Sequence, residues 1–375
     1  MDLKIGAAEL AHALGRSLGI VERKSTMPIL SHVLLEATAG GELRLSATDL
    51  DVSVSSVHPC EVASAGELAV SAKHLHDIVR SLPEQEVTLR RSSNAYLEVR
   101  SGSAQFKIVG LPASDFPTLP KFERVAFVPV DPATLLDQIE RTAFAASTDE
   151  TRYYLNGVFF EPRGDALRLV ATDGHRLAIS EKKLPGDFAL KKGVILPRKG
   201  LQELRKLLAE ATGGKDAPPE ARLGFAESSA IYRTAGVVLA MRLVEGAFPD
   251  YQQVIPKPGD HLMKLGRERF LETLRRVSLL AADKTLGVKL HLSPGALEVL
   301  SQNPDLGEAR EEVPVEYDGP KLQIGFNARY LIDVLTALHG DDVRVDLADD
   351  LSPALVTGAA EVDAGSTAVV MPMRI

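Results

Sequence analysis

One pattern in the sequence is typical of hydrolases that use a serine nucleophile. Residues 15–19 read GRSLG and match G-x-S-x-G, in which the serine stands on a sharp turn between a strand and a helix. Leu10 and Leu14, however, are four residues apart, as on the apolar face of a helix that runs into this stretch. We therefore expect Ser17 to lie inside or at the end of an amphipathic helix. A hydrolase that uses Ser17 is kept as an alternative function.

Two pairs of carboxylates could hold a metal ion for nuclease chemistry. Asp49 with Asp51 and Asp349 with Asp350 are such pairs, but neither stands beside a histidine or further carboxylate at the spacing of metal ligands. We expect them in turns or at strand ends. The sequence also has no G-x-x-x-x-G-K-S/T or G-x-G-x-x-G phosphate loop and no H-E-x-x-H zinc motif. No cofactor and no metal ion is expected, and a carboxylate-dependent nuclease is a second alternative.

The most suggestive polar cluster is the stretch TDGHRL at residues 172–177. It places an acid, a base and a cation close together in sequence, although neighbours along a chain seldom point at one substrate atom. Asp173 has counterparts in Asp49 and Asn303 at the same place in two other segments, so a turn role explains it. The glycine, histidine and arginine that follow Asp173 have no such counterparts. This asymmetry indicates a function confined to the middle of the chain.

Three segments predict amphipathic helices in one register. In each, two apolar residues four apart make a stripe, and an arginine two residues later lies roughly 160° from it, on the face turned away from the core. The apolar pairs and their arginines are Leu10, Leu14 and Arg16; Leu135, Ile139 and Arg141; and Phe270, Leu274 and Arg276.

A second helix is expected later in each segment, again with an apolar stripe. The stripes are Leu75, Ile78 and Leu82; Leu201, Leu204 and Leu208; and Leu331, Val334 and Leu338. A basic residue two positions before each stripe projects to the opposite side, and these residues are Lys73, Lys199 and Arg329. Arg80 and Lys206 share a further position on this outer face, and Thr336 interrupts the pattern in the third segment.

Each segment therefore predicts a helix, strands, a second helix and more strands, which is an α+β domain repeated three times. Strand-like runs such as 43–50 and 167–174 lie between the helices. The period is roughly 130 residues, long enough for each copy to have its own core. Phenylalanine-proline pairs in DFPTLPKFERV and FPDYQQVIPKP predict linkers. We place the domains at residues 1–122, 128–247 and 248–375.

The composition is that of an ordinary globular protein, with 45% apolar and 25% charged residues among 375. The single cysteine, Cys60, cannot form an internal disulfide bond. The first residues lack the apolar run of a secretory signal, and no segment has the roughly 18 apolar residues of a membrane span. We expect a cytoplasmic protein.

The net charge of −8 argues at first against a nucleic-acid partner, because phosphate binding needs clustered lysine and arginine. The charge is unevenly placed, since the expected helices have a small net positive charge and the strands and loops have the excess acid. These helices are expected at 7–21, 72–82, 131–147, 198–210, 266–282 and 328–340. If they shared one surface, it could attract phosphates while the rest of the molecule repelled them. Ordinary solvated helix faces are the other explanation.

Several long motifs together resemble one family. They are similar to motifs of the beta subunit of bacterial DNA polymerase III, the replicative sliding clamp, and the similarity runs along the whole chain. The motifs are LPASDFPTLP at 111–120, RYYLNGV at 152–158, ATDGHRLA at 171–178, FPDYQQVIP at 248–256 and the terminal VVMPMRI. The resemblance implies six clamp-type domains, each with two helices packed on antiparallel sheets, in a ring made by a head-to-tail homodimer. Such a heterologous contact closes after two copies.

The resemblance also implies which residues face DNA and which join the two chains. Lys24, Asp149, Tyr153 and Tyr154 stand where the family touches DNA, but Lys24 and Asp149 replace an arginine and a glutamine, which weighs against direct contact by Asp149. Phe106 of one chain would face Leu279 and Leu280 of the next. The residues expected to face DNA are Arg16, Lys24, Lys73, Arg80, Arg141, Tyr153, Tyr154, Arg198, Lys199, Arg205, Lys206, Arg276 and Arg329.

A hydrophobic pocket between the second and third domains is a further site that the resemblance implies. It would receive short linear motifs of partner proteins, and methionine, which adapts its shape, suits such a site. Gln253 replaces a basic residue often present beside Val254, which would alter the affinity for acidic peptide flanks. The pocket residues would be Leu155, Thr172, Gly174, His175, Arg176, Leu177, Pro249, Val254, Leu351, Pro353, Val369, Met371, Pro372, Met373 and Arg374.

We interpret the chain as a non-catalytic sliding clamp that encircles duplex DNA and makes the replicative polymerase processive by keeping it at high local concentration. The expected partners are double-stranded DNA of any sequence, a second copy of the chain, the polymerase subunit, the clamp loader and repair polymerases, and no membrane. The enzyme alternatives predict turnover that is lost on Ser17→Ala or Asp49→Ala. A scaffold that binds only proteins is the third alternative and would be indifferent to DNA topology.

Overall fold

The computed structural model describes residues 1–22, 26–120, 122, 125–184, 188, 190, 192–213, 220–226, 228–257, 259, 261–282 and 285–374. The chain forms two compact units, and the division between them passes through the middle copy of the repeat. The first unit comprises Met1–Ala133, Gly186–Leu190 and Lys199–Leu243, and the second comprises Thr134–Pro185, Lys191–Arg198 and Val244–Ile375.

The described residues contain six α-helices, where the apolar stripes predict them. They are α1 (Ala7–Ser17), α2 (Ala72–Arg80), α3 (Pro132–Glu140), α4 (Arg198–Thr212), α5 (Arg267–Val277) and α6 (Ala328–Ala337). The apolar pairs at the first stripe of each copy are all buried. The stripe on α2 differs from the prediction, because Val79 is buried and Ile78 is partly exposed. None of the described helices is long and apolar enough to cross a membrane.

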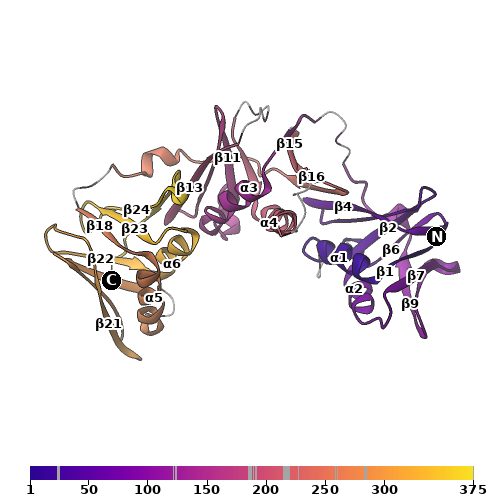
Figure 1. The fold of residues 1–375 in the computed structure, drawn as a ribbon, viewed down its shortest axis with the longest axis horizontal. Helices are drawn as coiled ribbons and strands as arrows, with labels where there is room; N and C mark the ends of the chain where they lie inside the picture. The colour runs from indigo at the N-terminus through magenta and orange to yellow at the C-terminus, as the bar shows by residue number, and fades with distance from the viewer. Residues whose placement is uncertain are drawn as a thin grey trace. The chain divides into compact units, whose positions relative to one another are not determined.

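The first unit contains a sheet of 13 strands, all paired antiparallel. In spatial order they are β10 (Phe127–Pro129), β15 (Arg222–Ala226), β16 (Ser229–Thr234), β17 (Val237–Arg242), β4 (Val52–Pro59), β3 (Glu42–Thr48), β2 (His32–Thr38), β6 (Gly66–Ser71), β9 (Ala104–Leu111), β8 (Tyr96–Ser101), β7 (Glu86–Arg91), β1 (Asp2–Gly6) and β5 (Glu61–Ser64). Helices α1 and α2 lie side by side (Figure 1).

The second unit contains two antiparallel sheets, with α5 and α6 side by side (Figure 1). The eight strands of the larger sheet are β14 (Val194–Pro197), β11 (Gly157–Arg163), β12 (Ala166–Thr172), β13 (Arg176–Lys183), β25 (Ser366–Val370), β24 (Ala354–Gly358), β23 (Asp342–Leu347) and β18 (His261–Gly266). The four strands of the smaller sheet are β21 (Gly307–Pro314), β20 (Ala296–Asn303), β19 (Gly287–Ser293) and β22 (Leu322–Asn327).

Consecutive copies of the repeat are joined by strand pairing inside each unit. In the first unit β4 of copy one pairs with β17 of copy two, which we call the first junction. In the second unit β13 of copy two pairs with β25 of copy three, which we call the second junction. Side chains alternate across each strand, so that Val52 and Val54 of β4 are buried on the side of α1 whereas Ser53 and Ser55 point to the opposite face.

Candidate nucleic-acid interface and partner pocket

The serine of the G-x-S-x-G pattern is not placed for catalysis. Ser17 is the last residue of α1 and is buried. Its Oγ lies 3.5 Å from the carbonyl oxygen of Ala13, one turn earlier in the same helix. The prediction that Ser17 stands at the end of an amphipathic helix is confirmed, and a nucleophile elbow is excluded at this position.

The carboxylates of the candidate metal sites close turns. The side chains of Asp49, Asp173 and Asp349 each accept hydrogen bonds from the backbone N–H groups two and three residues further on. Asn303 accepts from the N–H group two residues on. Gly174, directly after Asp173, has a φ of +88°, a conformation that favours glycine. The predicted turn role of these positions is therefore confirmed.

The sequence patterns did not reveal a serine, a histidine and a glutamate that meet between α1 and β4. Nε2 of His58 lies 2.8 Å from Oγ of Ser56, and Nδ1 lies 2.5 Å from Oε1 of Glu9. These groups have the order of a Ser-His-acid triad. Ser56 and His58 are each only 3% exposed, so the hydroxyl is closed to a substrate. The arrangement is a polar link that holds α1 against β4.

Arg141 does not lie on an exposed helix face, and its prediction as a DNA-facing residue is wrong. Helix α3 ends at Glu140, and the Arg141 side chain is 2% exposed. Its Nη1 lies 2.7 Å from Oδ1 of the buried Asp363, and its Nε lies 2.8 Å from Asp137. The physical reason is that the face turned away from the core of one copy is the face against which the next copy packs.

The carboxylate that receives Arg141 is held in its charged form. Burial by itself raises the pKa of Asp363, but hydrogen bonds from the backbone N–H groups of His339 and Gly340 and from Arg141 favour the charged carboxylate more strongly. The pKa of Asp363 is therefore lowered from its ordinary value. The second junction thus encloses an ion pair that is fully hydrogen-bonded.

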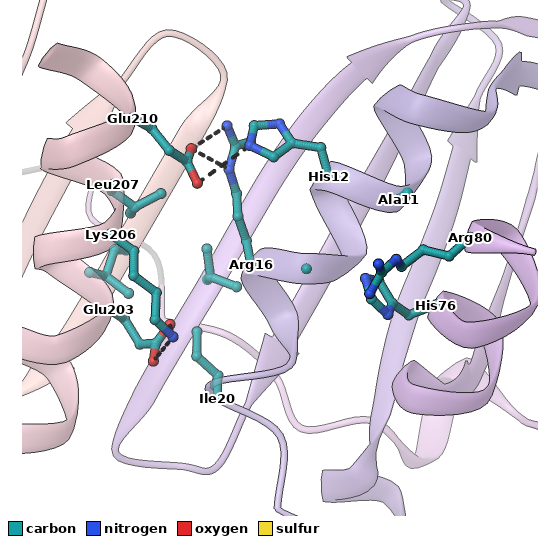
Figure 2. Close-up of a pocket in the computed structure, with 13 residues that line it drawn as sticks. Ala11, His12, Arg16, Ile20, His76, Arg80, Glu203, Lys206, Leu207 and Glu210 are labelled. Atoms are coloured by element: carbon teal, nitrogen blue, oxygen red, sulfur yellow. Dashed lines mark hydrogen bonds and ion pairs between the residues drawn. The ribbon is translucent and has the colours of Figure 1, made fainter. Parts of the chain in front are cut away.

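Arg16 occupies the matching position in the first copy and also reaches the next copy. Figure 2 shows its guanidinium beside Glu210 of α4, with Nε and Nη2 2.9 and 2.8 Å from Oε2. Nε2 of His12 lies 3.4 Å from the other oxygen of the same carboxylate. The Arg16 side chain is 17% exposed, so this pair is more open to water than that of Arg141.

Three more of the predicted DNA-facing cations are paired with carboxylates. Their partners are Asp49 for Lys199, Glu203 for Lys206 and Glu311 for Arg276. The hydrogen bond from Arg276 lowers the pKa of Glu311 to about 2, so this carboxylate stays charged. A cation that is already neutralised has less net charge to offer a phosphate. Arg205 is exposed and is also engaged in an interaction of its side chain or backbone.

Four predicted cations are exposed and form no ion pair with any described residue. Arg198 and Arg329 line one pocket of about 570 Å³ in the second unit, together with Arg152. Lys73 and Arg80 lie on α2 in the first unit. Lys24 lies outside the described residues. The other predicted cations that the structure describes are buried, paired with a carboxylate or otherwise engaged.

Two tyrosines predicted to touch DNA lie beside a capped turn. Tyr153 is exposed, and the ring of Tyr154 stands edge-on to it with centroids 5.7 Å apart. Asp149 caps the 3₁₀ helix that carries them, and hydrogen bonds from the hydroxyl and the backbone N–H of Thr151 lower the pKa of Asp149. The Asp149 carboxylate is therefore engaged within its own loop.

A cavity of about 360 Å³ lies between α1, α2 and α4 in the first unit (Figure 2). Its lining combines apolar residues such as Ile20 and Leu207 with His76 and Arg80. The glutamates beside it pair with Arg16 and Lys206, as the dashed lines show, so no carboxylate is left for acid or base catalysis. The cavity belongs to the helix face that carries the predicted DNA contacts.

An apolar cluster at the second junction includes two of the residues expected in the partner pocket, Leu177 and Val369. Its buried members are Val170, Leu177, Ile179, Tyr251 and Val369. Leu177 lies opposite Val369 in the ladder between β13 and β25. The exposed apolar side chains of the predicted pocket are Val254, Leu351 and Met371. Exposed apolar side chains are typical of a docking site only where they gather into one patch.

The other predicted pocket residues differ in exposure. Arg176 is nearly buried, because its guanidinium binds Asp173 and Asp333 and lies 4.6 Å above the ring of Tyr330. It supports the site from within rather than offering a free cation. Leu155 is buried, the exposed residues are Gly174, His175, Pro249 and Arg374, and the partly exposed ones are Thr172, Pro353, Pro372 and Met373.

The residues expected at the dimer seam are apolar and at least partly exposed. Phe106 lies on β9 in the first unit. Leu279 and Leu280 follow α5 in the second unit, and the Leu279 side chain is 77% exposed. Each is available for a contact with another chain.

Family models match three consecutive parts of the chain. The DNA polymerase III beta subunit, N-terminal domain, matches residues 1–120, the central domain matches 129–250 and the C-terminal domain matches 252–374. Each match falls on one copy of the internal repeat. The three clamp domains, each with two helices and antiparallel sheets, are thus shown by structure and comparison together.

Relatives and solved structures are similar over the full length, with 100% of both chains covered. The beta sliding clamps of Pseudomonas aeruginosa, Caulobacter vibrioides and Escherichia coli are 40%, 38% and 36% identical. The structures of sliding clamps from Pseudomonas aeruginosa and Bartonella birtlesii, both bound to griselimycin, have TM-scores of 0.91 and 0.92 at 38% and 37% identity. The chain therefore belongs to the DNA polymerase III beta subunit family and is a sliding clamp, a processivity factor rather than a catalytic subunit.

Proposed function

We propose that two copies of the chain close head to tail into a six-domain ring around duplex DNA, with domains at residues 1–122, 128–247 and 248–375. The observation that carries this proposal is the threefold repeat of one helix-and-sheet plan, matched along its whole length by a family whose members form dimeric rings. Enclosure keeps the protein on DNA without tight contacts. The protein would act in the cytoplasm, at sites of replication.

Open strand edges support the dimer. Along 104–109, β9 pairs with β8 and has no second partner among the described strands, and β21 pairs only with β20. Unpaired edges are usually protected or completed by another strand. Phe106 on β9 and Leu279 after α5 add apolar contacts near these edges. We infer that the edge of one chain completes the sheet of the next.

The DNA contacts would be few and electrostatic. The cations that pair with no described carboxylate, Lys73, Arg80, Arg198 and Arg329, would meet phosphates. Tyr153 and Tyr154 would add contacts without base recognition. Each phosphate contact releases counterions, so binding weakens as salt rises. A small number of contacts and an overall charge of −8 favour sliding over firm binding.

The apolar cluster at the second junction would recruit the polymerase subunit, the clamp loader and repair polymerases. The buried Leu177 and Val369 would form its floor, and the exposed Val254, Leu351 and Met371 would form its rim. Partner motifs would enter as short apolar segments, because the rim offers apolar surface and few free charges. Binding there would keep the polymerase at high effective concentration beside its template.

The ring is tested by loading the protein with a clamp loader and ATP onto nicked circular DNA and then cutting the circle. We expect a dimer mass in solution, retention on circles and loss from linear DNA. Leu279→Glu should give monomers that are not retained, whereas Leu262→Glu, which changes another exposed leucine, should behave as the unaltered protein. Persistence on linear DNA, or the absence of dimers, would contradict the proposal.

The partner pocket is tested separately from the ring. The double variant Leu351→Glu/Met371→Glu places charges on the rim without changing the buried cluster. It should still give a dimer mass in solution, but because the polymerase and the clamp loader would both bind this pocket, it should be loaded poorly and should no longer stimulate primer extension. Normal stimulation by this variant would show that partners bind elsewhere.

A further inference from the structure

The two junctions present different side chains at matching positions of the repeat. The sequence ATD, at 47–49 and 171–173, aligns the two sheets. Ser46, Ser53 and Ser55 in the first unit then correspond to Val170, Leu177 and Ile179 in the second. The strand registers agree, because Ser46 lies opposite Ser55 and Val170 lies opposite Ile179. The sheet face that is apolar in the second unit is therefore covered by serine hydroxyls in the first unit.

The apolar surface at the second junction is covered by a tyrosine of the following linker. Tyr251 is buried against Val170, Leu177 and Ile179. Its hydroxyl donates a hydrogen bond of 2.6 Å to Glu161 and accepts one of 3.1 Å from Arg168. Glu161 and Arg168 lie opposite each other on β11 and β12. The second junction therefore contains a binding site for a tyrosine side chain, which we call the tyrosine slot. An apolar sheet face contacts the ring, and the cross-strand pair of Glu161 and Arg168 binds the hydroxyl.

The first junction has the same acid and arginine but no tyrosine. Glu36 and Arg44 lie opposite each other on β2 and β3, as Glu161 and Arg168 do on β11 and β12. In the linker, Phe116-Pro117 corresponds to Phe248-Pro249, which places Leu119 at the position of Tyr251. Leu119 packs instead with Phe116 and its neighbours.

At the first junction the matching acid and arginine lack hydrogen-bond partners among the described residues. Glu36 and Arg44 form no side-chain hydrogen bond or ion pair with any residue that the structure describes, and Arg44 is exposed. An acid and an arginine that stand free at the end of a groove can take up a group that both donates and accepts a hydrogen bond. A phenol hydroxyl is such a group.

An open groove of about 510 Å³ occupies the place that Tyr251 fills at the second junction. Its floor includes Ser46, Ser53 and Ser55, and its walls include Leu119, Val238 and the prolines of the linker. The volume is within the range of sites that bind small ligands or peptide side chains. Apolar walls with a polar end suit an aromatic ring that carries a hydroxyl.

From this geometry we infer that the groove at the first junction binds a tyrosine side chain of an extended segment from a partner protein, with the hydroxyl between Glu36 and Arg44. The site is distinct from the partner pocket of the second junction and would allow a second protein to bind to the same chain. Its recognition depends on hydrogen bonds at the ring hydroxyl, whereas the other pocket offers mainly apolar surface.

The first test fills the groove from within. Leu119→Tyr places a tyrosine at the position that corresponds to Tyr251, and Leu119→Phe is its matched control without the hydroxyl. Because a hydrogen bond to a charged group stabilises a protein, we expect the Tm of Leu119→Tyr to exceed that of Leu119→Phe by about 2–4 °C. The difference should vanish in the background of Glu36→Gln/Arg44→Ala. Equal melting temperatures in the original background would overturn the inference.

The second test supplies the tyrosine on a peptide. The probe is the labelled decapeptide AFPDYQQVIP, which copies residues 247–256, and its version with Tyr251→Phe. Fluorescence anisotropy on the full-length protein should show binding that weakens about tenfold on loss of the hydroxyl. Arg44→Ala should weaken the original probe to the same extent and abolish the difference between the two peptides. Arg90→Ala, another exposed arginine, should change neither.

Three results would contradict the inference. The probe could fail to bind at about 1 mM, which is weaker than any useful docking site. Both peptides could bind equally, which would show that the hydroxyl is not recognised. Arg44→Ala could instead change the oligomeric state in sedimentation, which would make the groove an interface between copies of the chain. Saturable binding that Leu119→Tyr blocks, and Leu119→Phe blocks less, would support it.

Discussion

At the first junction Arg16 reaches Glu210 of the next copy, and at the second its counterpart Arg141 reaches Asp363. The Arg16 side chain is 17% exposed and its partner 33%, whereas Arg141 is 2% exposed and its partner 0%. The arginine at this position of the repeat therefore forms a partly exposed ion pair in the first unit and a buried ion pair in the second. In the third copy the matching Arg276 pairs with Glu311 and Glu272 of its own copy.

The difference between the junctions extends to the opposite face of the sheet. At the second junction Tyr251 fills the surface and its hydroxyl is bound, whereas at the first junction serines leave a groove. At one junction the hydroxyl of Tyr251 is bound by Glu161 and Arg168, and at the other Glu36 and Arg44 have no side-chain partner among the described residues. The repeated backbone thus determines which strands of consecutive copies pair. Single side chains determine how stable that contact is and whether a groove is left open beside it.

The largest expected effect comes from breaking the buried pair. Arg141→Ala leaves Asp363 charged and buried without its cation, which should cost about 3–5 kcal/mol in the free energy of unfolding. The matched change Arg16→Ala removes a more exposed pair and should cost about 1 kcal/mol or less. Urea unfolding followed by circular dichroism measures both. Equal costs would show that burial does not distinguish the two junctions.

The second effect is a dependence on pH. Because the pKa of Asp363 is lowered in the folded protein, its stabilisation is complete above the unfolded value of about 3.9 and is lost as the pH falls through the folded value. Asp363→Asn should therefore be less stable than the unaltered protein by about 2 kcal/mol at pH 7, and the gap should shrink below about pH 4. Thermal unfolding at several pH values checks this. A gap that widens in acid would contradict the assigned ion pair.

A smaller effect concerns the cations that would face DNA. Lys199 and Arg329 occupy the same position of the repeat, but Lys199 binds Asp49 at the first junction, whereas Arg329 pairs with no carboxylate in the part of the chain that the structure describes. Arg329→Ala should reduce the slope of log K against log salt by about 0.9 for binding to a short duplex, because one phosphate contact is lost. Lys199→Ala should change it less. Anisotropy titrations from low to moderate salt measure the slopes. If both variants changed the slope equally, pairing with Asp49 would not reduce the contribution of Lys199 to DNA binding.

The helices and the repeat were predictable because their signals are local. Apolar spacing of 3 and 4 residues places stripes such as Leu10 and Leu14 without knowledge of the rest of the chain. The exposure of Arg141 was not predictable, because its helix pattern shows only that it faces away from its own core. What packs on that face is a different copy, more than 200 residues away for Asp363.

The site could be predicted only in part for the same reason. Turn residues such as Asp173 follow from their repeated position. Leu177 and Val369 were expected only from the family resemblance, because burial does not alternate along β13 or β25. The meeting of Ser56, His58 and Glu9 depends on how α1 lies on β4, which no local pattern fixes. The groove at the first junction was not predicted, because its depth depends on where the linker runs past the serines of β3 and β4.

The smallest expected effect makes the first junction more like the second. Ser53→Leu installs the residue that stands at the matching position, Leu177, beside Ala240 of β17. The added side chain covers apolar surface of a partly exposed groove, so the protein should gain about 0.5–1 kcal/mol of stability. The reverse change, Leu177→Ser, removes a buried side chain opposite Val369 and should cost about 2–4 kcal/mol. Urea unfolding measures both changes. A loss of stability in Ser53→Leu would mean that the groove cannot accept an apolar side chain at its floor, and that the two junctions differ in backbone spacing as well as in side chains.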